Sequence, residues 1–154
     1  MAKPKRRWLT AWVPLRLELL VSPAWKARPA PVAKIIERLF EEHLRHGGLN
    51  NGQLFVAYSQ FVNEGVSRRS VRAALDCAVA LGLIEVTQDE EGRGDIRAPN
   101  QYRLTFLPCG KANPTDEWRL VTPERAQSAV AAFRKANNDN RKDSAVKLEV
   151  VGNG

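Results

Sequence analysis

Hydrophobic residues recur at the three- and four-residue spacing of an α-helix in three parts of the chain. The first is 31–46, which begins with a proline at Pro31 and stops at Gly47-Gly48. Its expected buried face consists of Ile35, Ile36, Leu39, Phe40 and Leu44. The second helix is expected over 67–81. Its buried stripe would consist of Val71, Ala74, Leu75, Ala78 and Val79. The third, over 122–136, has a narrow stripe made of Ala126, Ala129, Val130 and Phe133.

Strict alternation of apolar and polar residues predicts two strands, 83–87 and 101–107, joined by a polar loop rich in Asp, Glu and Gly. The inward face of the second strand would hold Tyr102, Leu104 and Phe106. A short apolar run at 54–57 predicts a small strand, and 58–64 predicts a short helix. The alternating residues at 15–19 fit either a strand or a short helix, and the pattern does not separate the two.

The resulting order is helix, strand, helix, glycine turn, helix, strand, loop, strand. It predicts an α+β fold of the winged helix-turn-helix type. We expect this domain over 31–107, after a basic arm and apolar N-terminal extension at 1–30. A C-terminal extension with a helix is expected at 108–136. The last segment, 137–154, is polar and ends in Gly and Asn, so we expect a disordered tail there.

The chain has 154 residues and a formal net charge of +7, which favours an anionic partner. The basic excess is concentrated in 1–30 and in 65–82. Two cysteines without metal-ligand spacing suit a reducing cytoplasm. Arg16 and Glu18 interrupt the N-terminal apolar run, which argues against a signal peptide. No run approaches the ~20 apolar residues that span a bilayer. We therefore expect a cytoplasmic protein that does not contact a membrane.

Three arginines, Arg68, Arg69 and Arg72, open the helix predicted at 67–81. In a winged helix-turn-helix this helix lies in the major groove of duplex DNA. There an arginine that bonds to both O6 and N7 of guanine gives ~1–3 kcal/mol of discrimination. Arg68 and Arg72 are four residues apart and so share a helix face. The alternative is a solvated face on which Arg72 pairs with Asp76.

Two serines accompany these arginines. Ser67 is expected to cap the helix, because its hydroxyl can accept from a free backbone N–H group. Together with the free N–H groups of the first turn, Ser67 and Ser70 are candidate phosphate ligands.

Two further basic segments are candidate DNA contacts. Arg93 and Arg97 lie near the tip of the hairpin loop and could enter the minor groove, although acidic residues at 89–91 would repel phosphate. The N-terminal residues Lys3, Lys5, Arg6 and Arg7 form either a phosphate-binding arm or a solubilising tail.

The remaining reactive side chains favour structural roles. His43 and His46 lack a third metal ligand nearby, and Cys77 lies on an apolar stripe. The four tryptophans could stack on single-stranded bases, but their apolar neighbours favour core or interface positions. The chain shows no nucleophile–base pair, paired carboxylates or phosphate-binding glycine loop. We therefore expect no enzyme, no metal and no cofactor.

The segment Gly65-Val66-Ser67-Arg68, Val71-Arg72, Ala74-Leu75 and Gly82-Leu83-Ile84 resembles the DNA-binding domain of GntR-type repressors. Two departures are visible: the segment before Gly65 is about one residue shorter than in that family, and no effector-binding domain follows. The resemblance therefore implies no small-molecule effector.

From 22 to 119 the chain also looks like short bacterial winged-helix proteins of the kind found in alphaproteobacteria and their mobile elements. The motifs that carry this likeness are SPAW, GVSRRSV, LGLIEV, YRLT and PTDEWR. It implies the fold and DNA binding, without a known target.

Sequence-specific binding of double-stranded DNA, in a transcriptional regulator, is therefore the predicted function. One alternative is an accessory DNA-binding role on a plasmid or mobile element, in replication initiation, excision or partition. Another is a winged-helix protein-interaction module. A homodimer is possible, with the helix at 122–136 and the tryptophan-rich N-terminal segment as candidate surfaces.

Overall fold

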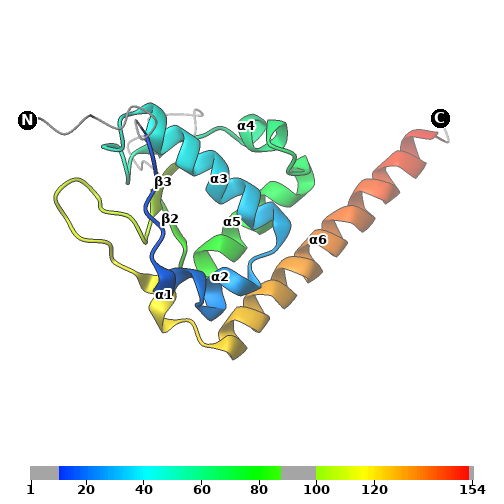
Figure 1. Ribbon diagram of the computed structural model, residues 1–154. Coiled ribbons are helices and arrows are strands. Elements are labelled where there is room, and N and C mark those ends of the chain that lie inside the picture. The colour runs from blue at the N-terminus through cyan, green and yellow to red at the C-terminus, as the bar shows by residue number, and fades with distance from the viewer. Residues whose placement is uncertain (1–10, 88–99, 153–154) are drawn as a thin grey trace, which may run out of the picture.

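The computed structural model describes residues 11–87 and 100–152 (Figure 1). Three helices open the described part of the chain: α1 (Leu17–Leu20), α2 (Pro23–Ala27) and α3 (Ala30–Arg45). Of the two structures that fitted 15–19, the short helix is therefore the one formed. Between α1 and α2, the Ser22 hydroxyl accepts from the backbone N–H of Trp25 at 3.2 Å and so caps α2.

The central elements follow the predicted order. They are β1 (Leu54–Phe55), α4 (Tyr58–Asn63), the 3-10 turn η1 (Arg68–Ser70), α5 (Val71–Ala80), β2 (Ile84–Thr87) and β3 (Gln101–Leu104). The strands form an antiparallel sheet in the order β1-β3-β2. In the β2–β3 pair, Ile84 faces Leu104 and Val86 faces Tyr102. The predicted α+β class is confirmed, with shorter strands than the alternation indicated.

Two details of the helix predicted at 67–81 are wrong. Its first turn is a 3-10 turn, so the α-helix begins at Val71 and not beside Ser67. Val79, expected in the buried stripe, is 44% exposed, although Val71, Ala74, Leu75 and Ala78 are buried as predicted.

The largest difference from the prediction is at the C-terminus. A single helix, α6 (Pro123–Gly152), runs through most of the segment that was expected to be a disordered tail. In Figure 1 it passes along one side of the molecule, and its C-terminal end projects beyond the other elements. The apolar stripe that ends at Phe133 is continued by Asn137 and Asn140, whose amides bond to the 3-10 turn η1. A hydropathy pattern cannot register polar contacts of this kind, which explains why the helix was not predicted as far as Asn140.

The core lies between α3, the sheet and α5, and α2 and α6 cover its remaining side. Phe106 contributes two edge-to-face ring pairs, with Trp25 at 5.7 Å and with Phe40 at 5.8 Å between centroids. Trp25 and Trp118 are buried, as the core assignment predicted, whereas Trp12 is 61% exposed. Trp8 lies outside the described residues.

Asn51 joins the loop before β1 to the end of β3. Its buried side-chain amide donates to the carbonyl of Leu104 at 2.9 Å, and its oxygen accepts from the Leu104 N–H at 2.8 Å. The same amide also bonds the carbonyls of Leu107 and Pro108. Asn51 therefore supplies the hydrogen bonds that a longer β1 strand would otherwise make.

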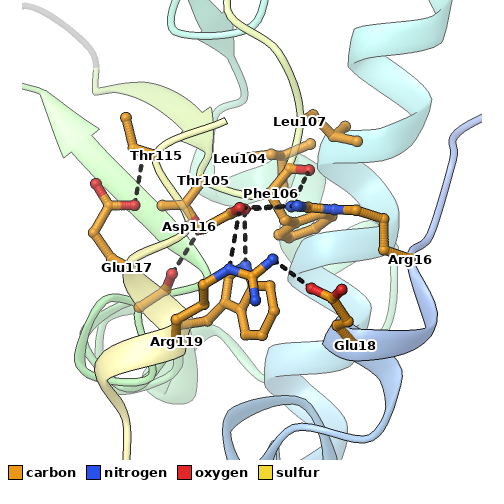
Figure 2. Close-up of polar contacts among 12 residues, drawn as sticks. Arg16, Glu18, Leu104, Thr105, Phe106, Leu107, Thr115, Asp116, Glu117 and Arg119 are labelled. Atoms are coloured by element: carbon orange, nitrogen blue, oxygen red, sulfur yellow. Dashed lines mark hydrogen bonds and ion pairs between the residues drawn. The ribbon is translucent and has the colours of Figure 1, made fainter. Parts of the chain in front are cut away.

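A polar network joins the N-terminal segment to the short 3-10 helix η2 (Glu117–Leu120), as Figure 2 shows. Asp116 accepts two bonds from the Arg16 guanidinium and one from the Trp118 indole at 3.0 Å. Arg119 completes the network with bonds to Glu18 and Asp116. Burial acts to raise the pKa of Asp116, but the bonds from Arg16 and Trp118 outweigh it, so its pKa lies below the ordinary value.

Gly82, at the end of α5, is the point where several elements meet. Its φ of +69° is a left-handed conformation, and an added Cβ would lie 2.7 Å from the backbone of Glu117 and Trp118. The Gly82 carbonyl accepts from the Thr105 hydroxyl at 2.6 Å, and the Thr105 carbonyl accepts from the Asp116 N–H at 3.0 Å. Helix α5, the end of β3 and η2 are thus held together by main-chain contact.

We expect Gly82→Ala to lower the free energy of unfolding by about 2–5 kcal/mol, because left-handed backbone strain and a main-chain collision add together. Gly47→Ala is the matched control: Gly47 has a φ of +68° with no atom within 4 Å of an added Cβ. The control should lose only about 1–2 kcal/mol. Urea unfolding followed by tryptophan fluorescence measures both. Equal losses in the two variants would contradict the close approach at Gly82.

His43 predicts a dependence of stability on pH. Its ring is buried, its Nδ1 has no hydrogen-bond partner among the described residues, and burial lowers its pKa below the ordinary 6.5. The unfolded chain therefore binds a proton more readily than the folded protein. We expect stability to be full above about pH 6.5 and to fall below it, by at most about 1.4 kcal/mol per pH unit.

Urea unfolding at pH 7 and at pH 5.5 tests this. The free energy of unfolding should change less between these two pH values in His43→Gln than in the wild type, because the glutamine side chain does not titrate. This holds even though the variant is less stable at both pH values. An identical difference in both proteins would mean that another group is responsible.

Candidate nucleic-acid interface

A tight turn connects α4 to the arginine-bearing segment. Gly65 has a φ of +100°, which allows the chain to reverse after α4, and Val66 is buried directly behind it. The ammonium of Lys34 on α3 donates to the Gly65 carbonyl at 3.3 Å. The turn is thereby attached to α3, and the segment that follows is directed outward.

All three predicted arginines are exposed on this segment. Arg68 and Arg69 lie in η1, for which we use the name arginine turn, and Arg72 lies in the first turn of α5. Arg72 and Asp76 form the ion pair of the alternative interpretation, with 3.5 Å between Nε and Oδ1. Because their side chains are 75% and 69% exposed, this pair lies in solvent and leaves the arginine accessible.

The structure changes the roles expected of the two serines. Ser67 is exposed, but its hydroxyl makes no capping bond to the turn, so the predicted cap is wrong. Ser70 is buried, and its hydroxyl donates to the side-chain oxygen of Asn137. Ser70 is therefore not available as a phosphate ligand in this structure, whereas Ser67 remains accessible.

Two structures flank the exposed face of α5. On one side lies α6, where Asn140 donates to the Arg69 carbonyl at 3.1 Å. On the other side an open cleft of about 390 Å³ separates α5 from β2. The residues that line the cleft are Tyr58, Arg72, Leu75, Asp76, Val79, Glu85, Val86 and Asn100.

Several of the predicted contacts fall outside the described residues. These are the arm residues Lys3, Lys5, Arg6 and Arg7 and the hairpin-loop residues Arg93 and Arg97. The segment from which the arm extends is described, and the Arg16–Asp116 contact attaches it to the domain (Figure 2). The strands that carry the loop are likewise held in register by Val86 and Tyr102.

Of the residues assigned to structural roles, His43 and Cys77 are buried, whereas His46 is exposed and contacts Glu42. Cys77 is buried, and burial raises the pKa of its thiol to about 11, which disfavours the reactive thiolate. Within 11–87 and 100–152 no group of three or more His, Cys, Asp or Glu side chains could hold a metal ion. In those same ranges no helix is long and apolar enough to cross a membrane.

Sequence reasoning missed three residues that shape this surface: Lys34, Asn137 and Asn140. The two asparagines did carry a signal, because they continue the spacing of Ala126, Ala129 and Phe133 along α6. If the helical spacing had been continued through polar residues, it would have placed both asparagines on the buried face of this helix. Lys34 offered no comparable signal, since an exposed helical lysine is ordinary.

Comparison of the chain with protein-family models, with curated proteins and with solved structures finds no match. The resemblance to GntR-type and other short winged-helix proteins therefore remains a prediction that rests on the motifs of the sequence.

The exposure of the Arg72–Asp76 pair predicts that it contributes little to stability. Arg72→Ala and Asp76→Ala should each change the free energy of unfolding by less than about 0.5 kcal/mol, with a coupling of similar size in a double-mutant cycle. Urea unfolding of the two single variants and the double variant measures this. A coupling well above 1 kcal/mol would assign the arginine a structural role.

Proposed function

We propose that the protein is a winged-helix protein that binds double-stranded DNA in a sequence-specific manner and acts as a transcriptional regulator. The observation that carries the proposal is the exposed group of three arginines at the start of the helix that follows the glycine turn. These side chains are accessible, and within 11–87 and 100–152 the one ion pair that involves them lies in solvent.

The topology supports this proposal. In a winged helix-turn-helix the first strand pairs with the last, which leaves the hairpin of the last two strands beside the second helix of the motif. The order β1-β3-β2 and the antiparallel pairing agree with that arrangement. In the proposed complex Arg68, Arg69 and Arg72 contact base edges and Ser67 contacts a phosphate. The N-terminal arm and the hairpin loop contribute charge that is independent of sequence.

A protein-interaction module is the second candidate, and the cleft beside Arg72 favours it. Its wall combines apolar side chains from α5 and β2 with two carboxylates, Asp76 and Glu85. Carboxylates repel phosphate, so this part of the surface suits a basic, partly apolar peptide better than a DNA backbone.

Selection from a randomised duplex library at near-physiological salt, followed by sequencing, tests the first candidate. We expect an enriched motif, and we expect Arg68→Ala and Arg72→Ala each to weaken binding to it by about 5- to 150-fold, as loss of a guanine contact requires. A two-fold symmetric motif would indicate a homodimer on an operator. Direct repeats would favour the accessory role on a mobile element.

Arg45→Ala is the matched control for Arg72→Ala, because Arg45 is an exposed arginine in an i,i+4 pair with Glu41 on α3. It should leave the affinity unchanged within about two-fold, the scale of a single remote surface charge. If the library yields no motif, the proposal of sequence-specific binding is wrong. If replacing all three arginines with glutamate also leaves the salt dependence of binding unaltered, the second candidate takes its place.

A further inference from the structure

The arginine turn rests on the middle of α6. Two asparagines, one helical turn apart, contact it in different ways. Asn137 accepts from the buried Ser70 hydroxyl, and Asn140 donates to the backbone carbonyl of Arg69. The Ser70–Asn137 contact spans 67 positions of the chain and the Arg69–Asn140 contact spans 71, so both are tertiary contacts.

The two ends of the turn are fixed by the buried residues Val66 and Val71. Within it, the Ser70 N–H bonds to the Ser67 carbonyl at 2.8 Å, and the expected cap from the Ser67 hydroxyl is missing. A 3-10 turn has poorer hydrogen-bond geometry than an α-helix and is stable only in short pieces. Arg68 and Arg69 point into solvent and add no packing of their own. Between these buried ends, the contacts of Ser70 and of the Arg69 carbonyl attach the backbone of the turn to α6.

From this geometry we infer that Asn137 and Asn140 are positioning residues for the arginine turn. They hold the backbone of Arg69 and Ser70 in the conformation that presents Arg68 and Arg69 to DNA, without touching DNA themselves. The expected effect on DNA binding rests on the proposed function. The expected effect on the free protein rests on the contacts alone.

The expected effect on binding follows from preorganisation. A base contact gives discrimination only if its donor is held in place before the complex forms, because ordering a loose segment opposes binding. Phosphate contacts tolerate more movement. Loss of the two asparagine contacts should therefore weaken binding to the selected motif more than binding to unrelated duplex DNA.

The first test uses the free, full-length chain and needs no DNA. Hydrogen–deuterium exchange of the peptide that covers residues 66–72 is compared in the wild type, in Asn140→Ala and in the double variant Asn137→Ala/Asn140→Ala. We expect exchange about five-fold faster in the single variant and about thirty-fold faster in the double variant, since each lost hydrogen bond removes roughly 1 kcal/mol of local protection.

Asn138→Ala is the matched control. Asn138 lies on the same helix and is exposed, with no hydrogen bond to the turn among the described residues, so its replacement changes helix propensity in the same way. Exchange at 66–72 should be unaltered in this control. The single variant Asn140→Ala keeps the test decisive if the double variant folds poorly, and its thermal midpoint should stay close to that of Asn138→Ala.

The second test measures the ratio of the dissociation constants for a scrambled duplex and for the selected duplex. We expect this ratio to fall about three- to ten-fold in Asn137→Ala/Asn140→Ala, with an unchanged slope of affinity against salt concentration, because no phosphate contact is lost. Asn138→Ala should keep the wild-type ratio. A structural role that merely supports the fold would lower both affinities together.

The outcomes separate the two proposals. Unaltered exchange at 66–72 in the double variant would overturn the inference, and so would faster exchange with an unchanged affinity ratio. If the wild type selects no duplex, the proposed function fails, and the exchange experiment alone decides whether the asparagines hold the turn.

Discussion

The main-chain contact at Gly82 is the constraint on which the arrangement of the other elements depends. An added Cβ at Gly82 would lie 2.7 Å from the backbone of Glu117 and Trp118, so the end of α5 can meet η2 only because Gly82 has no side chain. Thr105 bonds to Gly82, and Asp116 bonds to Thr105, so the contact extends through the end of β3 to the polar network. This single junction sets the direction of α5, the end of β3 in the hairpin and the start of α6.

This junction explains how an exposed group of arginines is held at a defined place. One end of α5 is fixed by Gly82, and the other end carries the arginine turn, which lies against α6 through Asn137 and Asn140. Since α6 begins shortly after η2, both ends of α5 are supported by the same C-terminal part of the chain. The C-terminal helix is thus an integral part of the domain and not an appendage to it.

Much of the fold could be predicted because its elements have apolar faces of regular period. The faces of α3, α5 and α6, the paired strands and the glycine stops are all local signals, and each was found within a few residues of its predicted place. The errors lie where polar groups decide the structure. The cap expected from Ser67 is absent, Ser70 is buried against the amide of Asn137, and Asn137 and Asn140 attach part of the expected tail to the arginine turn.

The sequence by itself determined the class of fold, the order of its elements and the concentration of basic residues at the start of one helix, because hydropathy and charge act locally along the chain. Only the tertiary structure decided which of those residues are accessible and what supports them. Arg68, Arg69 and Arg72 are exposed and Ser70 is not. That distinction depends on a helix nearly seventy residues further along the chain, and no local pattern encodes a contact over that separation.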